Sequence, residues 1–563
     1  MRSTKRQLRN RPHPRRGITL VVVAIGLMAL FGLLGLVIDG GLLMSSQRQA
    51  QNAADAAARA CAKQVARFEA TGGDISGVTG ATLLPTATLY ALTYNGVPVD
   101  SAPPSGGQIV VNHPPTTGPY ASGTNRYRYV EVFVTYPLDT VFMQVTGTAR
   151  HRQITARAVA GYELEQRGAG LVVLDPRGNP GLSVSGTNAN LTVGTSADPD
   201  DGNVYVYSLR GGVDEFGQKV VGDGVTDPIN PGQPAATIGG GATLTADHVY
   251  VSGGVDVGTN FGAGLDAGGL TPVFDPFHVD AGQLNPGPPP SAAVYLAVPI
   301  VGNGAVNRDL GSVSVSSGFD GKGLIAPNSF KKGNIGGTTT LYPGIYSNIS
   351  ITGGEVVLNP GIYVLRPTSG TGSNILTING GTVTGTNVMF YNTGSTYSPA
   401  AANGNPAGYP DTTDLSRLSN YAPTSSDVSG QQFGGIDIHG SGVTLTPIDM
   451  TKTGANYYSL GVGQGGPVVP AVSGTAIAPF HKMLIYQRRF NTQAMHITDG
   501  LPITSGGLQG ILYAKWANLQ LAGSGTYNFA TVVGTMSVSG NATFTASNSL
   551  PYPPIIRPVF LVQ

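Results

Sequence analysis

The sequence predicts a membrane-spanning helix, then a small α+β domain, then a long all-β region. Three observations support this fold class. An uncharged apolar run of 22 residues lies near the N-terminus, at residues 17–38. A helical stripe of small residues and two strand-like runs follow it. From residue 168 onward, short runs of alternating apolar and polar residues recur between Gly, Asn, Ser and Pro.

The composition excludes several classes of protein. The 563 residues include 82 Gly and 40 Pro, and only 11% are charged, less than half of the ~25% typical of soluble domains. The formal net charge is +1, which predicts no nucleic-acid partner. A single Cys excludes an intramolecular disulfide framework and a Cys-rich zinc module. No strict Gly-X-Y period is present, which excludes collagen.

The N-terminus reads as an uncleaved membrane anchor. Residues 1–16 form a basic tail without an acid, and residues 17–38 (GITLVVVAIGLMALFGLLGLVI) carry no charge. At 1.5 Å per residue this helix is ~33 Å long, enough for the bilayer core. The basic tail places the N-terminus in the cytoplasm and sends the bulk of the chain, after Asp39, to the periplasm or the cell exterior. A cleaved signal peptide is the alternative, but its apolar region is normally shorter.

The helix is expected to continue beyond the membrane over residues 39–71, because residues 42–68 contain no Gly or Pro. Small residues recur there at spacings of three and four, which places them on one helical stripe. Its members are Ala50, Ala54, Ala57, Cys61, Val65 and Phe68. The stripe packs either on the protein's own next domain or on another chain. Cys61 within it is either a small buried residue or, outside the cytoplasm, half of an interchain disulfide.

A small α+β domain is expected over residues 72–165. Residues 129–136 alternate as a strand does, and residues 154–162 form a second strand-like run. A helix followed by a small sheet is the α+β order.

The N-terminal third resembles a known family. The motif that carries the resemblance is a basic start with Arg15-Arg16-Gly17, an apolar span, Asp39, and then residues 49–58 (QAQNAADAAA). This pattern resembles the N-terminal domain of TadG-like proteins of the tight-adherence (Flp) pilus assembly system. The resemblance extends to about residue 163, and it implies a pilin-like α+β domain and a role in pilus assembly.

One feature of related pseudopilins is missing. Those proteins are cut after a Gly and carry Glu at the fifth mature position, whereas a cut after Gly17 would place Val22 there. The departure favours the uncleaved form.

The region 168–563 is expected to be a Gly-rich β-solenoid. Its apolar residues alternate with Ser and Thr, giving an inward apolar face and an outward polar one. Residues 341–346 (LYPGIY) and 358–363 (LNPGIY) are nearly literal repeats. Because one such repeat cannot bury its apolar face alone, stacking is required. A right-handed parallel β-helix is the leading architecture, and a β-sandwich is the alternative.

Three segments within this region are expected to depart from the stack. Residues 285–291 (NPGPPPS) form a stiff break. Residues 395–432 are polar with few strand candidates, which indicates a long loop. The apolar run 554–562 is expected to cap the last repeat.

The sequence predicts no catalytic, cofactor-binding or metal-binding residues. No His-Glu-x-x-His motif is present, and five of the histidines are far apart in this region: His248, His278, His439, His481 and His496. The closest grouping of acids is Asp275 and Asp280 with His278, which reads as a loop. Lys482, Arg488 and Arg489 read as a solvated strand end, with sugar or partner contact as the alternative.

We therefore expect a non-enzymatic, membrane-anchored structural or assembly protein that displays an exterior β-helix for anchoring or adhesion. Its expected partners are the lipid bilayer and, through the small-residue stripe, other pilus-assembly proteins. The alternative is a surface glycan-binding or glycan-cleaving β-helix protein.

Overall fold

The structure is a computed structural model of the whole chain. It describes residues 16–70, 74–97, 107–139, 151–166, 168–194, 202–222, 232–262, 264–269, 273, 275, 309–316, 332–335, 338–341, 343–368, 373–397, 423, 430–440, 442–447, 482–498, 507–523, 526–546, 550 and 555–562. The basic tail up to residue 15, the break at 285–291, His278, Asp280 and His481 lie outside these residues. The chain divides into two units, which are 1–69 with 73–163 and 558–563, and 70–72 with 164–557.

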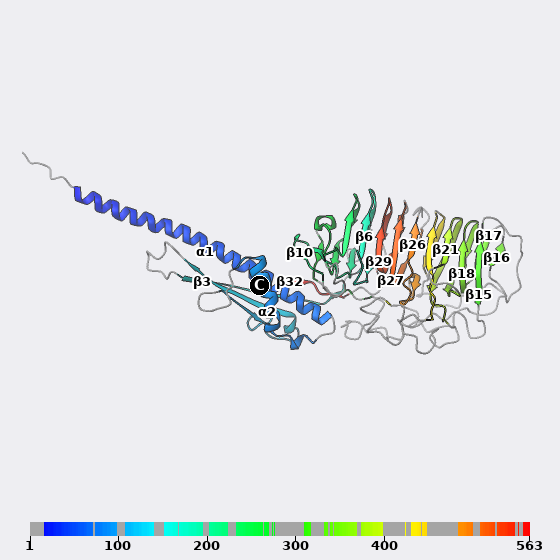
Figure 1. The fold of residues 1–563 in the computed structure, drawn as a ribbon, viewed down its shortest axis with the longest axis horizontal. Helices are drawn as coiled ribbons and strands as arrows, with labels where there is room; N and C mark the ends of the chain where they lie inside the picture. Colours follow the sequence, from blue (N-terminus) through cyan, green and yellow to red (C-terminus); the bar gives the residue numbers. More distant parts are fainter. Residues whose placement is uncertain are drawn as a thin grey trace, which may run out of the picture. The chain divides into compact units, whose positions relative to one another are not determined.

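The first unit is built on one long helix, α1 (Arg16–Ala70) (Figure 1). After it come η1 (Ile75–Gly77), α2 (Gly80–Thr88), η2 (Leu89–Tyr94), β1 (Gln108–Asn112), η3 (Arg126–Arg128), β2 (Tyr129–Asp139), β3 (His151–Tyr162) and, from the end of the chain, β32 (Val559–Leu561). These strands form one antiparallel sheet in the order β1-β2-β3-β32. The expected long helix and the strands expected at 129–136 and 154–162 are therefore present.

The C-terminal strand belongs to this sheet. Val559, Phe560 and Leu561 pair with the end of β3, and the amide of Val562 donates to the Val159 carbonyl at 2.9 Å. The expectation that this run caps the last repeat of the β region is wrong for β32. Residues 164–557 are therefore an insertion between two neighbouring strands of the first unit.

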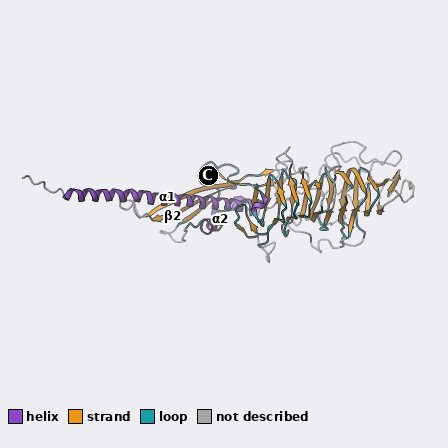
Figure 2. Ribbon diagram, turned by 90° about the horizontal axis from the view of Figure 1, so that it is seen from above, coloured by secondary structure: helices purple, strands orange, loops and turns teal. Residues whose placement is uncertain are grey.

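The second unit is mostly β with parallel sheets, as Figure 2 shows in orange. Its first strands are β4 (Glu165–Gln166), β5 (Leu171–Val173), β6 (Leu182–Ser185), β7 (Asn190–Val193), β8 (Asn203–Val206), β9 (Gly212–Val213), β10 (Lys219–Val220), β11 (Ala236–Gly239), β12 (Thr243–Thr245), β13 (His248–Val251) and β14 (Leu265–Ala267), with η6 (Gly258–Phe261) before β14.

The later strands of this unit complete the stack. They are β15 (Asp309–Val315), β16 (Lys332–Ile335), β17 (Thr338–Leu341), β18 (Gly344–Ile351), β19 (Glu355–Leu358), β20 (Gly361–Leu365), β21 (Asn374–Asn379), β22 (Thr382–Asn392), β23 (Gly435–His439), β24 (Val443–Pro447), β25 (Met483–Gln487), β26 (Met495–Thr498), β27 (Ile511–Ala522), β28 (Thr526–Asn528), β29 (Ala530–Val538), β30 (Thr543–Ala546) and β31 (Ile555–Ile556).

The strands do not stack in the order of the sequence. Through successive parallel pairings one column runs β14-β13-β8-β5-β29-β27-β25-β22-β20-β18-β15. From β5, the early strands β8, β13 and β14 stack in one direction. The later strands begin with β15 at the opposite end of the column and stack back toward β5, where β29 pairs with β5. Figure 1 shows this as a red strand, β29, beside the green-blue β6.

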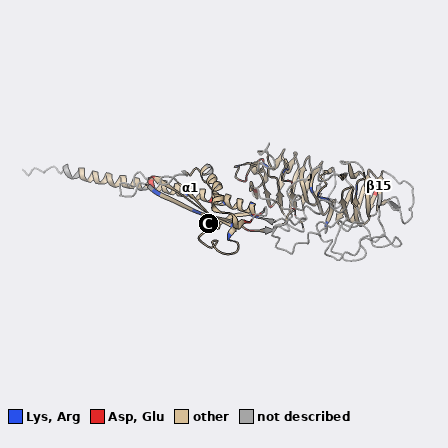
Figure 3. Ribbon diagram, turned by 60° about the horizontal axis from the view of Figure 1, so that its bottom comes forward, with Lys and Arg blue, Asp and Glu red and all other residues tan. Residues whose placement is uncertain are grey.

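Two apolar clusters hold the second unit together. The larger fills the interior with residues such as Leu171, Val184 and Ile378. The smaller lies on the other side of one sheet and includes Val172, Tyr486 and Tyr513. Because neighbours along a strand point to opposite faces, Leu171 and Val172 belong to different clusters. Charged side chains are sparse on the described strands (Figure 3).

A glycine is required at one turn where two layers of the stack come close together. Gly381 has φ +81, and a Cβ added there would lie 2.5 Å from the carbonyl oxygen of Gly354 in the layer beside it. Only glycine adopts this left-handed backbone without strain and leaves room for the neighbouring turn.

The polar segment 395–432 is described only near its ends. The amide of Ser395 donates to the Gln432 carbonyl at 3.0 Å, and the Gln432 amide donates to Ser395 Oγ at 3.0 Å. The two described ends of the segment therefore lie side by side, and the expected loop between them falls largely outside the described residues.

Candidate functional site: membrane helix, stripe and buried ion clusters

The N-terminal half of α1 is an exposed apolar surface. Leu20 is 74% exposed, Val22 62% and Leu33 63%, although such side chains are normally buried. Among the described residues, α1 is the one helix that is long and apolar enough to cross a membrane. Exposed on this scale, the apolar surface fits lipid better than water.

The C-terminal half of α1 packs on the unit's own sheet. The stripe residues Ala50, Ala54, Ala57 and Cys61 are 0% exposed, and they share one cluster with the inward side chains of β2 and β3. Small side chains let the helix lie close to the sheet. The stripe is therefore covered by its own domain rather than free for another pilus-assembly protein. Phe68 is the exception, at 44% exposed.

Cys61 takes the buried role. Its Sγ donates to the carbonyl of Leu83 in α2 at 3.6 Å. Burial raises the pKa of the Cys61 thiol to about 12, so the reactive thiolate is scarce at neutral pH. An interchain disulfide at Cys61 does not fit this position.

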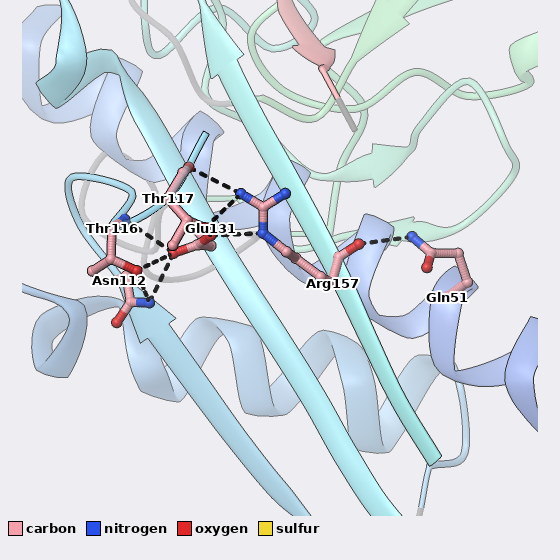
Figure 4. A network of polar contacts seen from close by, with 6 residues as sticks. All are labelled: Gln51, Asn112, Thr116, Thr117, Glu131 and Arg157. Atoms are coloured by element: carbon pink, nitrogen blue, oxygen red, sulfur yellow. Dashed lines mark hydrogen bonds and ion pairs between the residues drawn. The ribbon is translucent and has the colours of Figure 1, made fainter. Parts of the chain in front are cut away.

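A buried carboxylate holds the sheet of the first unit together (Figure 4). Glu131 on β2 is fully buried and accepts five hydrogen bonds. Asn112 Nδ2 donates to Oε2 at 2.9 Å, and the amide and Oγ1 of Thr116 donate to Oε2 at 3.0 and 2.8 Å. Thr117 Oγ1 and Arg157 Nε donate to Oε1 at 2.9 and 2.7 Å. The Glu131 carboxylate thereby joins β1, β2, β3 and the loop after β1.

The pKa of Glu131 follows from these contacts. Burial alone would raise the pKa, but the hydrogen bonds from Asn112, Thr116 and Arg157 stabilise the charged form more strongly and lower the pKa to about 2. Glu131 is consequently ionised at any physiological pH.

The run QAQNAADAAA at residues 49–58 connects α1 to this network. Gln51 Nε2 donates to the carbonyl of Arg157 at 3.1 Å and to Asp55 Oδ1 at 2.8 Å. Both Gln51 and Asp55 lie in the run QAQNAADAAA. The motif's polar residues therefore fix the register between helix and sheet, while its alanines supply the close packing.

The second unit contains a buried ion cluster that the sequence did not predict. Asp275, Arg489, Tyr513 and Lys515 are all at most 3% exposed. Tyr513 Oη donates to Asp275 Oδ2 at 2.6 Å, Arg489 Nε donates to Tyr513 Oη at 2.8 Å, and Lys515 Nζ lies 3.5 Å from Asp275 Oδ2. Arg489 Nε is also 3.4 Å from Asp275 Oδ2.

The structure contradicts the expectation that Arg488 and Arg489 belong to a solvated strand end. Arg488 and Arg489 are each 2% exposed, so they do not form a solvated strand end. Asp275, which lies between β14 and β15 in the sequence, contacts Tyr513 and Lys515 of β27. Burial raises the pKa of Tyr513 well above its usual value, with the negative charge of Asp275 adding to the effect.

Two histidines that are 57 positions apart lie on neighbouring paired strands, with their side chains on the face opposite the interior residues Ile438 and Ile497. His439 on β23 and His496 on β26 lie on paired strands, whose partners are Asp437 with His496 and His439 with Thr498. The sequence missed this grouping because the partner of a strand in a stack depends on the length of the intervening loop. Within the described part of the chain, no group of three or more His, Cys, Asp or Glu side chains could hold a metal ion.

Comparison with known proteins gives one finding, at the N-terminus. No curated protein and no solved structure matches the chain. Residues 17–64, which span the exposed apolar half of α1 and most of the small-residue stripe, match a family model. That family is described as putative Flp pilus-assembly TadE/G-like, and the N-terminal segment of this chain is thus similar to it.

Proposed function

We propose that the chain is a single-pass, membrane-anchored pilus-assembly protein that displays its insertion for anchoring or adhesion. The observation that carries the proposal is the coincidence of the exposed apolar helix with the TadE/G-like segment at residues 17–64. The basic tail favours a cytoplasmic N-terminus with the rest of the chain in the periplasm or outside the cell. This role needs no chemical step.

The insertion is best interpreted as a right-handed parallel β-helix. Its support is the parallel pairing of successive layers, such as β18 on β21, β21 on β23 and β23 on β26. The sheets of a β-sandwich are antiparallel, so that alternative fits less well. A long stack of this kind suits display because each layer adds length without a new core.

Two measurements test the anchor. Intact cells carrying a tag at either end of the chain are treated with protease. Loss of the C-terminal tag alone supports the orientation, whereas loss of the N-terminal tag contradicts it. Recovery of intact full-length protein in the detergent-free soluble fraction would contradict the anchor itself.

The display role has a sharper test, because residues 164–557 enter and leave between paired strands. Joining Glu163 to Pro558 through a short turn keeps the first unit and removes the insertion. We expect this variant to stay in the membrane fraction and to co-purify with the other pilus-assembly proteins, but to lose cell adhesion. Unchanged adhesion would exclude the display role while leaving the anchor intact.

A further inference from the structure

A buried lysine amine lies within reach of a buried carboxylate in the second unit. Lys515 Nζ is 3.5 Å from Asp275 Oδ2, and the two side chains are 2% and 0% exposed. The same oxygen accepts a hydrogen bond from Tyr513 Oη at 2.6 Å and lies 3.4 Å from Arg489 Nε. An amine, a carboxyl group and two donors to that carboxyl oxygen therefore meet at one point, shielded from bulk water.

The stacked layers hold this arrangement. Tyr513 and Lys515 both belong to β27, and residues two apart on a strand project to the same face. Arg489 follows β25, whose Tyr486 is the register partner of Tyr513 and stacks on its ring with the centroids 4.8 Å apart. Arg489 Nε donates to the Tyr513 hydroxyl at 2.8 Å, which leaves the hydroxyl proton for Asp275. The donors are thus in place before any reaction.

Burial changes what the lysine can do. It disfavours both charges of the Lys515–Asp275 pair, because neither ion keeps its shell of water. Passing one proton from the ammonium to the carboxylate leaves two neutral groups, an amine and a carboxylic acid. Arg489 cannot take this route, since a guanidinium keeps its proton in proteins. Lys515 is therefore the cation that supplies a nucleophile, as lysines do in desolvated sites beside another cation.

The geometry favours condensation of the two groups. Reacting groups held at ~3–3.5 Å reach effective molarities of ~10⁵–10⁸ M. Negative charge develops on the carboxyl oxygen when Cγ becomes tetrahedral, and the donors of Tyr513 and Arg489 stabilise it there. The product is a neutral amide, which removes the cost of keeping two ions in the interior. An ordinary ion pair has the same separation, so the mass of the chain distinguishes the two states.

We propose that Lys515 and Asp275 become joined by an intramolecular isopeptide bond, a modification independent of the assembly role. Nζ bonds to Cγ, Oδ2 carries the developing charge and becomes the amide oxygen, and the Cγ–Oδ1 bond breaks. Oδ1 leaves as water, with the proton that the acid received from the ammonium and a second proton from Nζ. One ammonium and one carboxylate thus give one amide and one water, without an oxidant or a cofactor.

The bond would cross-link distant parts of the second unit. It ties residue 275, which lies between β14 and β15 in the sequence, to β27. The two linked residues are more than two hundred positions apart. A cross-link that closes so long a loop restricts the unfolded chain strongly and thereby favours the folded one. It would also keep the two segments together if the strands between them opened.

Mass spectrometry of the full-length protein, purified in detergent, tests the bond. The intact chain is expected to be lighter by one water. Tryptic digestion after denaturation should give a branched peptide that contains Asp275 and Lys515, with no cleavage after Lys515. Lys515→Arg keeps the positive charge but offers no amine, so it should restore the lost water and give separate peptides. Tyr513→Phe keeps the ring without the donor and should slow linkage by ~10²-fold, measured in protein sampled at intervals after a pulse of synthesis.

Lys219→Arg is the matched control, because Lys219 is exposed on β10. This variant should retain the branched peptide. The thermal unfolding midpoint of each variant identifies any that fails to fold. Wild-type protein that yields only the unlinked peptides overturns the proposal, and so does a deficit of one water that persists in folded Lys515→Arg. Linkage at the wild-type rate in Tyr513→Phe would contradict the part assigned to the Tyr513 hydroxyl.

Discussion

Tyr162 and Val559 are register partners in the adjacent antiparallel strands β3 and β32. The last strand of the chain therefore completes the sheet that packs on α1, although 396 residues separate the two partners. The first unit cannot reach its full set of backbone hydrogen bonds until the whole insertion has been synthesised.

Ending the chain at Arg557 should destabilise the first unit. The truncation removes β32 and exposes the outer edge of β3, whose amides then exchange with water. We expect faster hydrogen exchange along β3 and a lower unfolding midpoint, by ~2–4 °C for each kcal/mol lost. Removal of Gln563 alone is the control. Equal protection of β3 in both chains would show that β32 adds nothing to the unit.

Enlarging the stripe should separate helix from sheet. Ala57 is 0% exposed against the sheet, so Ala57→Leu has no room and should cost ~1–3 kcal/mol of unfolding free energy. Asn52→Leu on an exposed position of the same helix should cost much less. Chemical denaturation in detergent measures both. A tolerated leucine at 57 would mean that the helix does not lie on the sheet as described.

Acid should weaken the first unit through Glu131. The folded pKa of Glu131 is about 2, below the usual ~4.3 of a free Glu. The stabilisation is therefore complete above pH ~4.3 and is lost as the pH falls toward 2. Glu131→Gln should remove this pH dependence and, because it leaves Arg157 and the donors poorly matched, lower stability by ~3 kcal/mol at neutral pH. Glu355→Gln, at an exposed position, is the control. A wild-type acid profile in Glu131→Gln would refute the assignment.

Removing Asp275 should lower the unfolding free energy of the second unit, because Asp275 is the carboxylate beside two buried cations. Asp275→Ala leaves Arg489 and Lys515 without their carboxylate, and we expect a loss of ~3–5 kcal/mol in the second unit. Adding Lys515→Met should recover part of this loss, because one of the two buried positive charges beside position 275 disappears. Thermal unfolding of the two variants and the wild type decides the matter, and equal stability of Asp275→Ala and wild type would contradict the cluster.

Cys61 should resist alkylation in the folded protein. Its thiol is buried and its pKa is raised to about 12, so iodoacetamide at pH 8 should label it only after unfolding. Mass spectrometry measures the labelling, and non-reducing gels should show monomer. Rapid labelling of the native chain, or a dimer that Cys61→Ser abolishes, would count against its burial.

Local patterns predicted the elements well. The uncharged span and the alternating Ser/Thr runs depend on neighbours within ten residues, and α1 and strands such as β21 lie where those patterns indicated. The near-repeats at residues 341–346 and 358–363 do contribute to adjacent paired strands, β18 and β20, but the pairing is offset by two residues, with Gly344 opposite Tyr363 rather than Gly361.

Long-range placement could not be predicted. Nothing near Leu171 indicates that its partner is Thr531, because the pairing depends on how many layers the chain adds before it returns. For the same reason, the sequence did not predict the contact between Asp275 and Arg489 or the contact between His439 and Thr498. The basic run was misread since its partner carboxylate is more than two hundred positions away.

The seam between Leu171 and Thr531 has a consequence for how such proteins can vary. The first and last parts of the inserted segment, β5 and β29, pair within the column of strands. The strands at the two ends of the column, β14 and β15, therefore take no part in this pairing. Duplication or loss of a whole layer at either end of the stack would change the number of layers in the second unit without altering the pairing of β5 with β29. We therefore expect relatives whose insertion has more or fewer layers while the first unit is unchanged.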